Sequence, residues 1–419
     1  MQLKAQTSMR HRLSVATACL LSMDGSLALA ESLADWQFEA SYMRYAEANR
    51  ITVNESIIAA KRELDNESIR GTIIYDSMSG ASPNGAVPPS DSTQTYTSPS
   101  GSIFQVAPDE LPADEFKDRR TAFSLAWSVP VMRTVQASLS GLYSTETDYL
   151  SYGSEASLAW DINTRLTTLV TALSANWDTS KPIGGIPTGF TPGSNTDRYR
   201  EDNKFIMDWM VGVKQVINRR SYLQLNYGFG KASGYLSDPY KVISFVSGAT
   251  GEPIGARGYY FEKRPDSRTQ QNLYLRLVSH INDTTYQLAY RYYEDDWGVR
   301  SHTFHGKFII SLTPKHVLEP ALRHYRQQAA NFYHYALYDG PGEGVLMKDV
   351  VNASRGLSHA SADYRLGELT THTIGVKYLY RYKQGHIGLR INYLRQQDQR
   401  SLFTTVQAWI SQVIFKLRF

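Results

Sequence analysis

Charged side chains recur at alternate positions of apolar, strand-like stretches of this sequence. Glu319 and Arg323, for example, alternate with Leu318 and Leu322. A lysine or arginine facing lipid near the midplane of a membrane barrel costs about 2–4 kcal/mol, so such charges must face the lumen if these strands span a membrane. Lumenal charges could bind and select small ions. The candidates for the lining of a pore are Arg70, Asp76, Lys214, Arg276, Arg291, His305, Lys307, Glu319, Arg323, Lys377, Arg381, His386 and Arg390.

The basic members of this set outnumber the acidic ones, and two interpretations follow. An open pore with excess positive charge would favour anions. Alternatively, ion pairs between arginines and carboxylates would fill a narrow or plugged lumen and hold its wall together, because charges inside a protein need partners. The sequence leaves both interpretations open.

Other residues offer little sign of catalysis, metal binding or a cofactor. Glu294, Asp295 and Asp296 could bind a divalent cation, but they lack the spacing of a calcium loop, so we expect a solvated turn. The ten histidines form no HExxH motif, and the sequence contains no GxSxG motif. The one cysteine, Cys19, lies in a predicted signal segment, so the mature chain would have no disulfide and no thiolate ligand. We therefore expect neither an enzyme nor a cofactor.

Residues 1–30 are typical of a secretory signal peptide. Basic residues precede the apolar run Leu13–Met23, and Ala28–Ala30 forms an A-x-A cleavage site. The mature chain would then be residues 31–419, in which we find no run of 18 apolar residues that could form a transmembrane helix. The net charge of +4 is too small to indicate a nucleic-acid partner.

Alternation with a period of two predicts an all-β protein, a transmembrane antiparallel up-and-down β-barrel of about sixteen strands (14–16). The 28 tyrosines and 7 tryptophans suit the aromatic girdles of such barrels. The second predicted strand alternates poorly and the first two strands are weak, which makes the strand count uncertain. Short and long connections alternate along the chain, as they do when one rim is periplasmic and the other extracellular. Long extracellular loops are expected near residues 78–118, 178–203, 231–268 and 329–371.

The last predicted strand, residues 402–419, gives the strongest support for a membrane barrel. Trp409, Phe415, Leu417 and Phe419 share one face. An exposed aromatic edge strand would invite aggregation in a soluble protein, whereas a closed barrel pairs it on both sides. The ending also resembles the C-terminal signal of bacterial outer-membrane barrels, so we expect it to bind the barrel assembly machinery.

Several stretches resemble the DUF3570 family of predicted outer-membrane barrels. They are Ser79–Ala86, Glu146–Tyr149, Tyr290–Tyr293, Asp295–Gly298 and Leu318–Arg323, together with Tyr325, Gln327 and Phe332. The resemblance implies an outer-membrane barrel but no particular activity. It also points loosely to bacterial gene clusters for flavin-transferase-like and thioredoxin-like proteins.

The sequence thus predicts a barrel in bacterial outer-membrane lipid that passes small polar solutes, with a weak preference for anions. The alternative is a structural or partner-binding component of an exported redox or flavinylation system. An outer-membrane enzyme with catalytic groups converging at the rim is a third possibility. A clear bore would favour the first hypothesis, and a filled bore the second.

Overall fold

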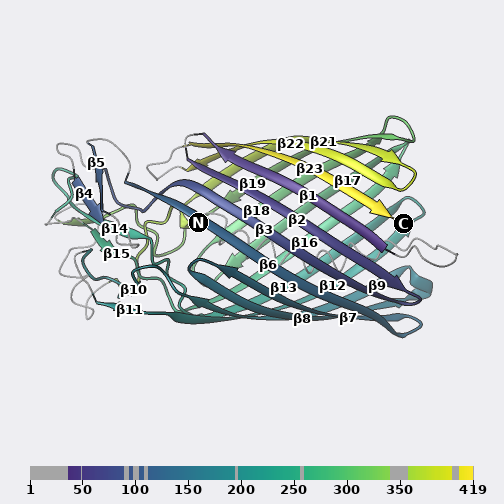
Figure 1. Cartoon of the computed structure of the whole chain (residues 1–419), viewed down its shortest axis with the longest axis horizontal. Helices are drawn as coiled ribbons and strands as arrows, with labels where there is room; N and C mark the ends of the chain where they lie inside the picture. The colour runs from purple at the N-terminus through teal and green to yellow at the C-terminus, as the bar shows by residue number, and fades with distance from the viewer. Residues whose placement is uncertain are drawn as a thin grey trace.

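Sixteen antiparallel strands form a closed barrel (Figure 1), which confirms the predicted fold class. The structure is a computed structural model, and it describes residues 36–48, 50–88, 94–97, 103–107, 112–193, 197–254, 259–339, 357–398 and 405–418. The strands of the barrel are β1 (Trp36–Glu47), β2 (Ile51–Leu64), β3 (Glu67–Pro83), β6 (Ala113–Met132), β7 (Val135–Glu146), β8 (Tyr149–Ile162), β9 (Thr167–Ser180), β12 (Asp202–Asn218), β13 (Ser221–Gly234), β16 (Ser267–Ile281), β17 (Thr284–Asp295), β18 (Arg300–Ser311), β19 (His316–Gln327), β21 (Leu369–Tyr382), β22 (Gly385–Asp398) and β23 (Thr405–Arg418).

The barrel closes where β1 pairs with β23. Phe38 lies opposite Leu417 and Tyr42 opposite Val413 in this antiparallel pair. Closure satisfies the backbone hydrogen-bonding groups on both sides of every strand, which a membrane barrel requires because lipid offers no partners. Trp409, Phe415 and Leu417 share the outward parity of β23, whereas Phe419 and the predicted signal peptide lie outside the described residues.

The outer surface is apolar. Leu139, Leu322 and Ile374 leave 56%, 56% and 63% of their surfaces exposed. A strand that faced water would rarely expose so much apolar surface. Leu169, Leu173 and Trp177 point the same way on β9, whose facing the sequence alone did not reveal. The alternate positions face the lumen. The outer surface is therefore suited to acyl chains rather than water.

The two ends of the barrel differ. At the turn end, on the right of Figure 1, two to four residues join consecutive strands. At the loop end lie the small strands β4 (Gln94–Thr97), β5 (Ile103–Val106), β10 (Ile186–Pro187), β11 (Arg198–Tyr199), β14 (Val242–Ser247), β15 (Tyr259–Phe261) and β20 (Leu337–Asp339). Two 3₁₀ turns, η1 (Asn163–Arg165) and η2 (Tyr364–Leu366), complete the elements.

Two strands extend further than the sequence predicted. β3 continues to Pro83 and β6 already begins at Ala113, within the stretch 78–118 that we expected to be a loop. Ser79 lies opposite Lys117 and Ala81 opposite Glu115, so the backbone ladder continues through serine, glycine and alanine. Weak side-chain alternation hid this extension, because the ladder itself is made by the backbone.

Leu139 and its neighbour Ser140 provide a test of this facing. We expect Leu139→Lys to destabilise the barrel by about 2–4 kcal/mol, because it places a charge in lipid near the middle of β7. Ser140→Lys should be tolerated, because Ser140 faces the lumen opposite Glu155 on β8. Urea unfolding in lipid vesicles, followed by tryptophan fluorescence, measures both. Equal destabilisation by the two variants would contradict the assigned faces.

Candidate functional site: the lumenal charges and the loop-end cap

The strand alternation places all thirteen candidate pore residues on the inner face of the barrel wall. On β16, for example, Arg276 lies between the outward-facing Leu275 and Leu277. On β22, Arg390 lies between Leu389 and Ile391, which also face outward. That these residues line a conducting pore remains a prediction.

The register brings several candidates into one transverse row. Lys214 lies opposite Gln224, and Gln224 lies opposite Arg276. Arg276 lies opposite Ala289 on β17, and Ala289 lies opposite His305 on β18. His305 in turn lies opposite Arg323 on β19. Because this order follows from backbone pairing, it does not depend on any side-chain rotamer.

A second row runs beside the first on the next strands. Glu319 lies opposite Lys377 on β21, and Lys377 lies opposite Arg390 on β22. The Glu319 carboxylate lies 3.1 Å from Lys377 Nζ and 3.8 Å from Lys307 Nζ. One carboxylate therefore serves two lysines of two different strands.

Elsewhere in the lumen, basic side chains pair with carboxylates. Glu39 lies 2.7 Å from both Arg70 and Lys416, and Asp76 pairs with Arg120. This part of the wall fits the interpretation of arginine–carboxylate pairs that hold the lumen together. The sequence did not single out Arg120, whose partner lies 44 residues away in the chain.

The sector around His305 is different, because Arg276 and Arg390 bind neutral groups there. Arg276 donates to the Gln287 amide oxygen at 3.0 Å, and Arg390 donates to the Gln412 amide oxygen at 3.2 Å. Arg276 and Lys214 also both lie over the Tyr222 ring, at 6.0 and 4.8 Å from its centroid. Among the described residues, neither Arg276 nor Arg390 makes an ion pair. The lumen thus combines a part in which arginines pair with carboxylates and a part of excess positive charge in which Arg276 and Arg390 do not.

The loop end carries a folded body, which we call the cap, made of residues 84–88, 181–193, 235–254, 259–266, 328–339 and 357–368. Its centre is a buried apolar cluster of Ile243, Phe245, Tyr260 and Leu337, contributed by β14, β15 and β20. β14 pairs with β15 in an antiparallel and with β20 in a parallel arrangement. These loops are therefore a small hydrophobic core and not separate surface excursions.

The cap extends across the mouth of the barrel. The Val242 amide donates to Asn84 O at 2.9 Å, and Lys241 Nζ donates to Pro83 O. Pro83 ends β3, whereas Lys241 follows β13, six strands further round the sixteen-strand circle. Because segments from nearly opposite sides of the wall touch, they must meet over the opening.

Gly85 lies at this junction. Its φ is +101°, and a Cβ there would lie 2.4 Å from Val242 O, so only glycine allows this approach without strain.

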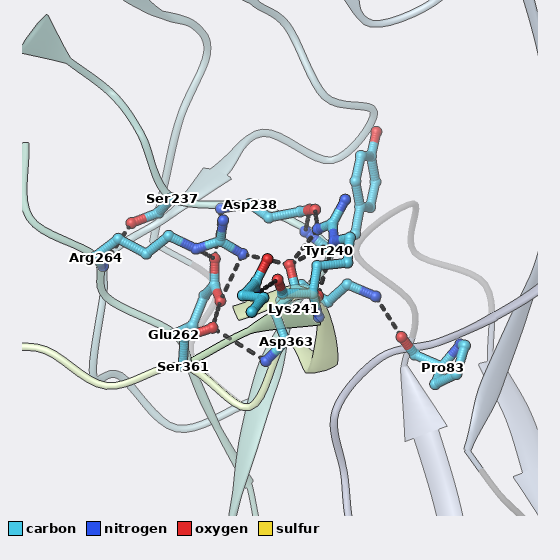
Figure 2. Close-up of polar contacts among 11 residues, drawn as sticks. Pro83, Ser237, Asp238, Tyr240, Lys241, Glu262, Arg264, Ser361 and Asp363 are labelled. Carbon is cyan, nitrogen blue, oxygen red and sulfur yellow. Dashed lines mark hydrogen bonds and ion pairs between the residues drawn. The ribbon is translucent and has the colours of Figure 1, made fainter. Parts of the chain in front are cut away.

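A buried ionic network holds the cap together (Figure 2). Asp363 accepts from Arg264 at 2.8 Å and pairs with Arg365, which also reaches Asp238 at 2.8 Å. Arg264 also lies 2.7 Å from Glu262, to which Ser361 donates. Three acids, Asp238, Glu262 and Asp363, thus meet three bases, Lys241, Arg264 and Arg365.

Burial and charge act on these groups in opposite directions. Burial by itself would raise the pKa of Asp363, but Arg365, Arg264 and Lys241 hold it well below its usual range. Burial raises the pKa of Glu262 despite its contact with Arg264, and burial lowers the pKa of Lys241. The Asp363 carboxylate is therefore the anion that the two guanidinium groups share.

The turn Asp295–Gly298 corrects one prediction. We expected a solvated turn, and Asp296 is indeed exposed, yet the Asp295 side chain is fully buried and pairs with Arg268. The guanidinium carbon of Arg268 lies 4.4 Å from the centre of the Trp297 ring, and Trp297 packs on Phe332 of the cap at 5.1 Å. The sequence did not predict the burial of Asp295, because its partner Arg268 is 27 residues away. It therefore anchors the cap and is not a free cation ligand.

Sequence reasoning missed the cap, although a signal was present. The stretch 231–268 was assigned to a loop, but it contains the apolar runs Val242–Val246 and Tyr259–Phe261. Such runs inside a polar loop indicate a small core of their own.

Three carboxylates at the loop end come close together. Oxygens of Asp118, Glu146 and Asp148 lie within 4.8 Å of one another, and Tyr240 donates to Asp148 at 2.5 Å. Acidic groups often cluster in this way without a metal ion, and we assign no ion to them. Across the described residues, no helix has the length and apolar character needed to cross a membrane.

A closed barrel with an apolar outer surface and a charged lumen defines an outer-membrane β-barrel protein. The chain belongs to the DUF3570 family, described as a protein of unknown function, whose sequence model matches residues 10–416. This confirms the resemblance noted in the sequence. No curated protein matches the chain.

The chain is similar to several solved structures at low sequence identity. The ferric enterobactin receptor PfeA is 10% identical with a TM-score of 0.43, over 88% of this chain and 55% of the receptor. The siderophore receptor PirA from Pseudomonas aeruginosa is 7% identical with a TM-score of 0.42, over 92% of this chain and 62% of the receptor. A bacterial polysaccharide outer membrane secretin is 8% identical with a TM-score of 0.45, over 93% of this chain and 100% of the secretin. This chain thus spans little more than half the length of the two receptors.

Proposed function

We propose that this outer-membrane barrel is a channel or transporter for small polar solutes that prefers anions, with the cap on the extracellular side. The observation that carries the proposal is the unbalanced positive sector of the lumen around Arg276, His305 and Arg390. A pore wall with excess positive charge attracts anions and repels cations. Sixteen strands are enough to enclose an aqueous channel.

Single-channel recording of the refolded protein in a planar bilayer tests this proposal. With a salt gradient, we expect stable steps and a reversal potential that indicates anion preference. The Arg276→Glu/Arg291→Glu variant should shift the reversal potential towards cations, because it replaces two lumenal positive charges with negative ones. A folded barrel without conductance would contradict the channel, as would a reversal potential that the variant leaves unchanged.

A second function is favoured by the cap. A folded body over the mouth of a barrel also suits a structural or partner-binding component, because loops that only edge a pore need no core of their own. In that case the cap surface would bind a partner, and no ions or solutes would pass through the lumen. A silent bilayer together with an intact barrel would favour this second function.

A further inference from the structure

The lumenal cluster around His305 has many positive charges and few negative ones. Arg276, Arg323 and Arg390, together with Lys307, lie close enough to act electrostatically on the His305 ring. They come from four strands, β16, β18, β19 and β22. The cluster is thus a convergence across the wall and not a feature of one strand.

Its charge balance is incomplete. Among the described residues, Glu319 is the one carboxylate paired within this sector, and it contacts Lys307 and Lys377, whereas Arg276 and Arg390 make no ion pair. The lumenal carboxylates of Glu39 and Asp76 serve other cations. Like charges held together in a partly desolvated space repel one another, and a counter-ion relieves this repulsion.

The cluster also retains unused donors, and a small side chain lies within its row. An arginine has five N–H donors. Arg276 uses one of its donors for Gln287, and Arg390 uses one of its donors for Gln412. Between Arg276 and His305 in the row stands Ala289, whose methyl group occupies little of the lumen. Arg276, His305 and Arg390 are all half-buried, so solvent reaches them.

We infer that this cluster is a binding site for an oxyanion with two or more negative charges, such as a phosphate, a pyrophosphate or a dicarboxylate. Guanidinium groups bind such anions through paired N–H···O bonds, which a halide cannot accept. A monovalent anion would leave most of the excess charge unbalanced. The inference deepens the proposed function, on which it rests, since it turns general anion preference into a saturable site.

Equilibrium binding to the refolded full chain in zwitterionic detergent tests the site without any flow across a membrane. Isothermal titration at low ionic strength would use inorganic pyrophosphate, succinate and acetate. We expect one saturable site for at least one of the two multivalent anions and at least tenfold weaker binding of acetate. Preference for pyrophosphate would assign phosphoryl chemistry to the site, and preference for succinate would assign carboxylate chemistry.

The variant Arg276→Gln/Arg390→Gln should weaken binding of the preferred anion at least tenfold. Its matched control, Arg62→Gln/Arg119→Gln, removes the same charge from the outer face and should bind as the native protein does. Heat-modifiable migration on a gel shows that each variant is a folded barrel. Absence of saturation in the folded native protein would overturn the inference, and so would equal weakening by both variants or equal binding of acetate.

This result is separable from the test of transport. Saturable binding in a barrel that conducts no ions would contradict the channel and keep the site. Conductance without saturable binding would do the reverse.

Discussion

Asp363→Ala should open the cap and leave the barrel folded. The carboxylate of Asp363 is fully buried and pairs with Arg264 and Arg365, so its removal leaves two guanidinium groups in the cap with one anion fewer. Breaking a buried ion pair on one side costs about 3–5 kcal/mol. If protease cleavage follows the population of the open cap, this predicts a rise of roughly a hundredfold or more in the cleavage rate between β13 and β16.

Limited proteolysis in detergent, with mass spectrometry of the fragments, measures this rate. Glu201→Ala is the matched control, because it removes a carboxylate from the loop end that forms only an exposed pair with Lys181 at 3.1 Å. Such a pair contributes about 0–1 kcal/mol, so little change is expected. Cleavage of Asp363→Ala at the native rate would show that the network does not hold the cap.

Removing the centre of the cap should raise the unitary conductance several-fold. The two ends of the β13–β16 connection lie close together, since the Arg264 amide donates to Ser237 Oγ at 3.0 Å. Replacing residues 239–262 with two glycines would therefore delete β14 and β15 without pulling on the barrel strands. A sixteen-strand barrel whose mouth is cleared should behave as an open aqueous channel.

The sign of the reversal potential serves as an internal control for this deletion. It should stay on the anion side, because the charged rows of the lumen are untouched. Unchanged conductance in a folded deletion variant would place the constriction inside the lumen. A change of sign would mean that the cap, rather than the Arg276 and Arg390 sector, sets the selectivity.

The alternation of residues by itself determined the class of fold and the facing of the wall. Leu275 and Leu277 on either side of Arg276 were sufficient to predict that Arg276 faces the lumen, because a strand has a period of two and a charge in lipid is costly. The same pattern predicted that Glu319, Lys377 and Arg390 face inward. These properties are local, so a single strand reveals them.

Only the tertiary structure decided which charges meet. The pairs Asp76–Arg120 and Glu39–Arg70 join strands far apart in the sequence. They depend on the register between strands, whereas alternation shows only which face of the strand a residue occupies. Asp295 was misread for this reason, because its partner Arg268 lies on another strand. The sequence did not predict the cap for a similar reason. Phe245 and Leu337, which are 92 residues apart, form a core only when barrel closure brings their two connections together.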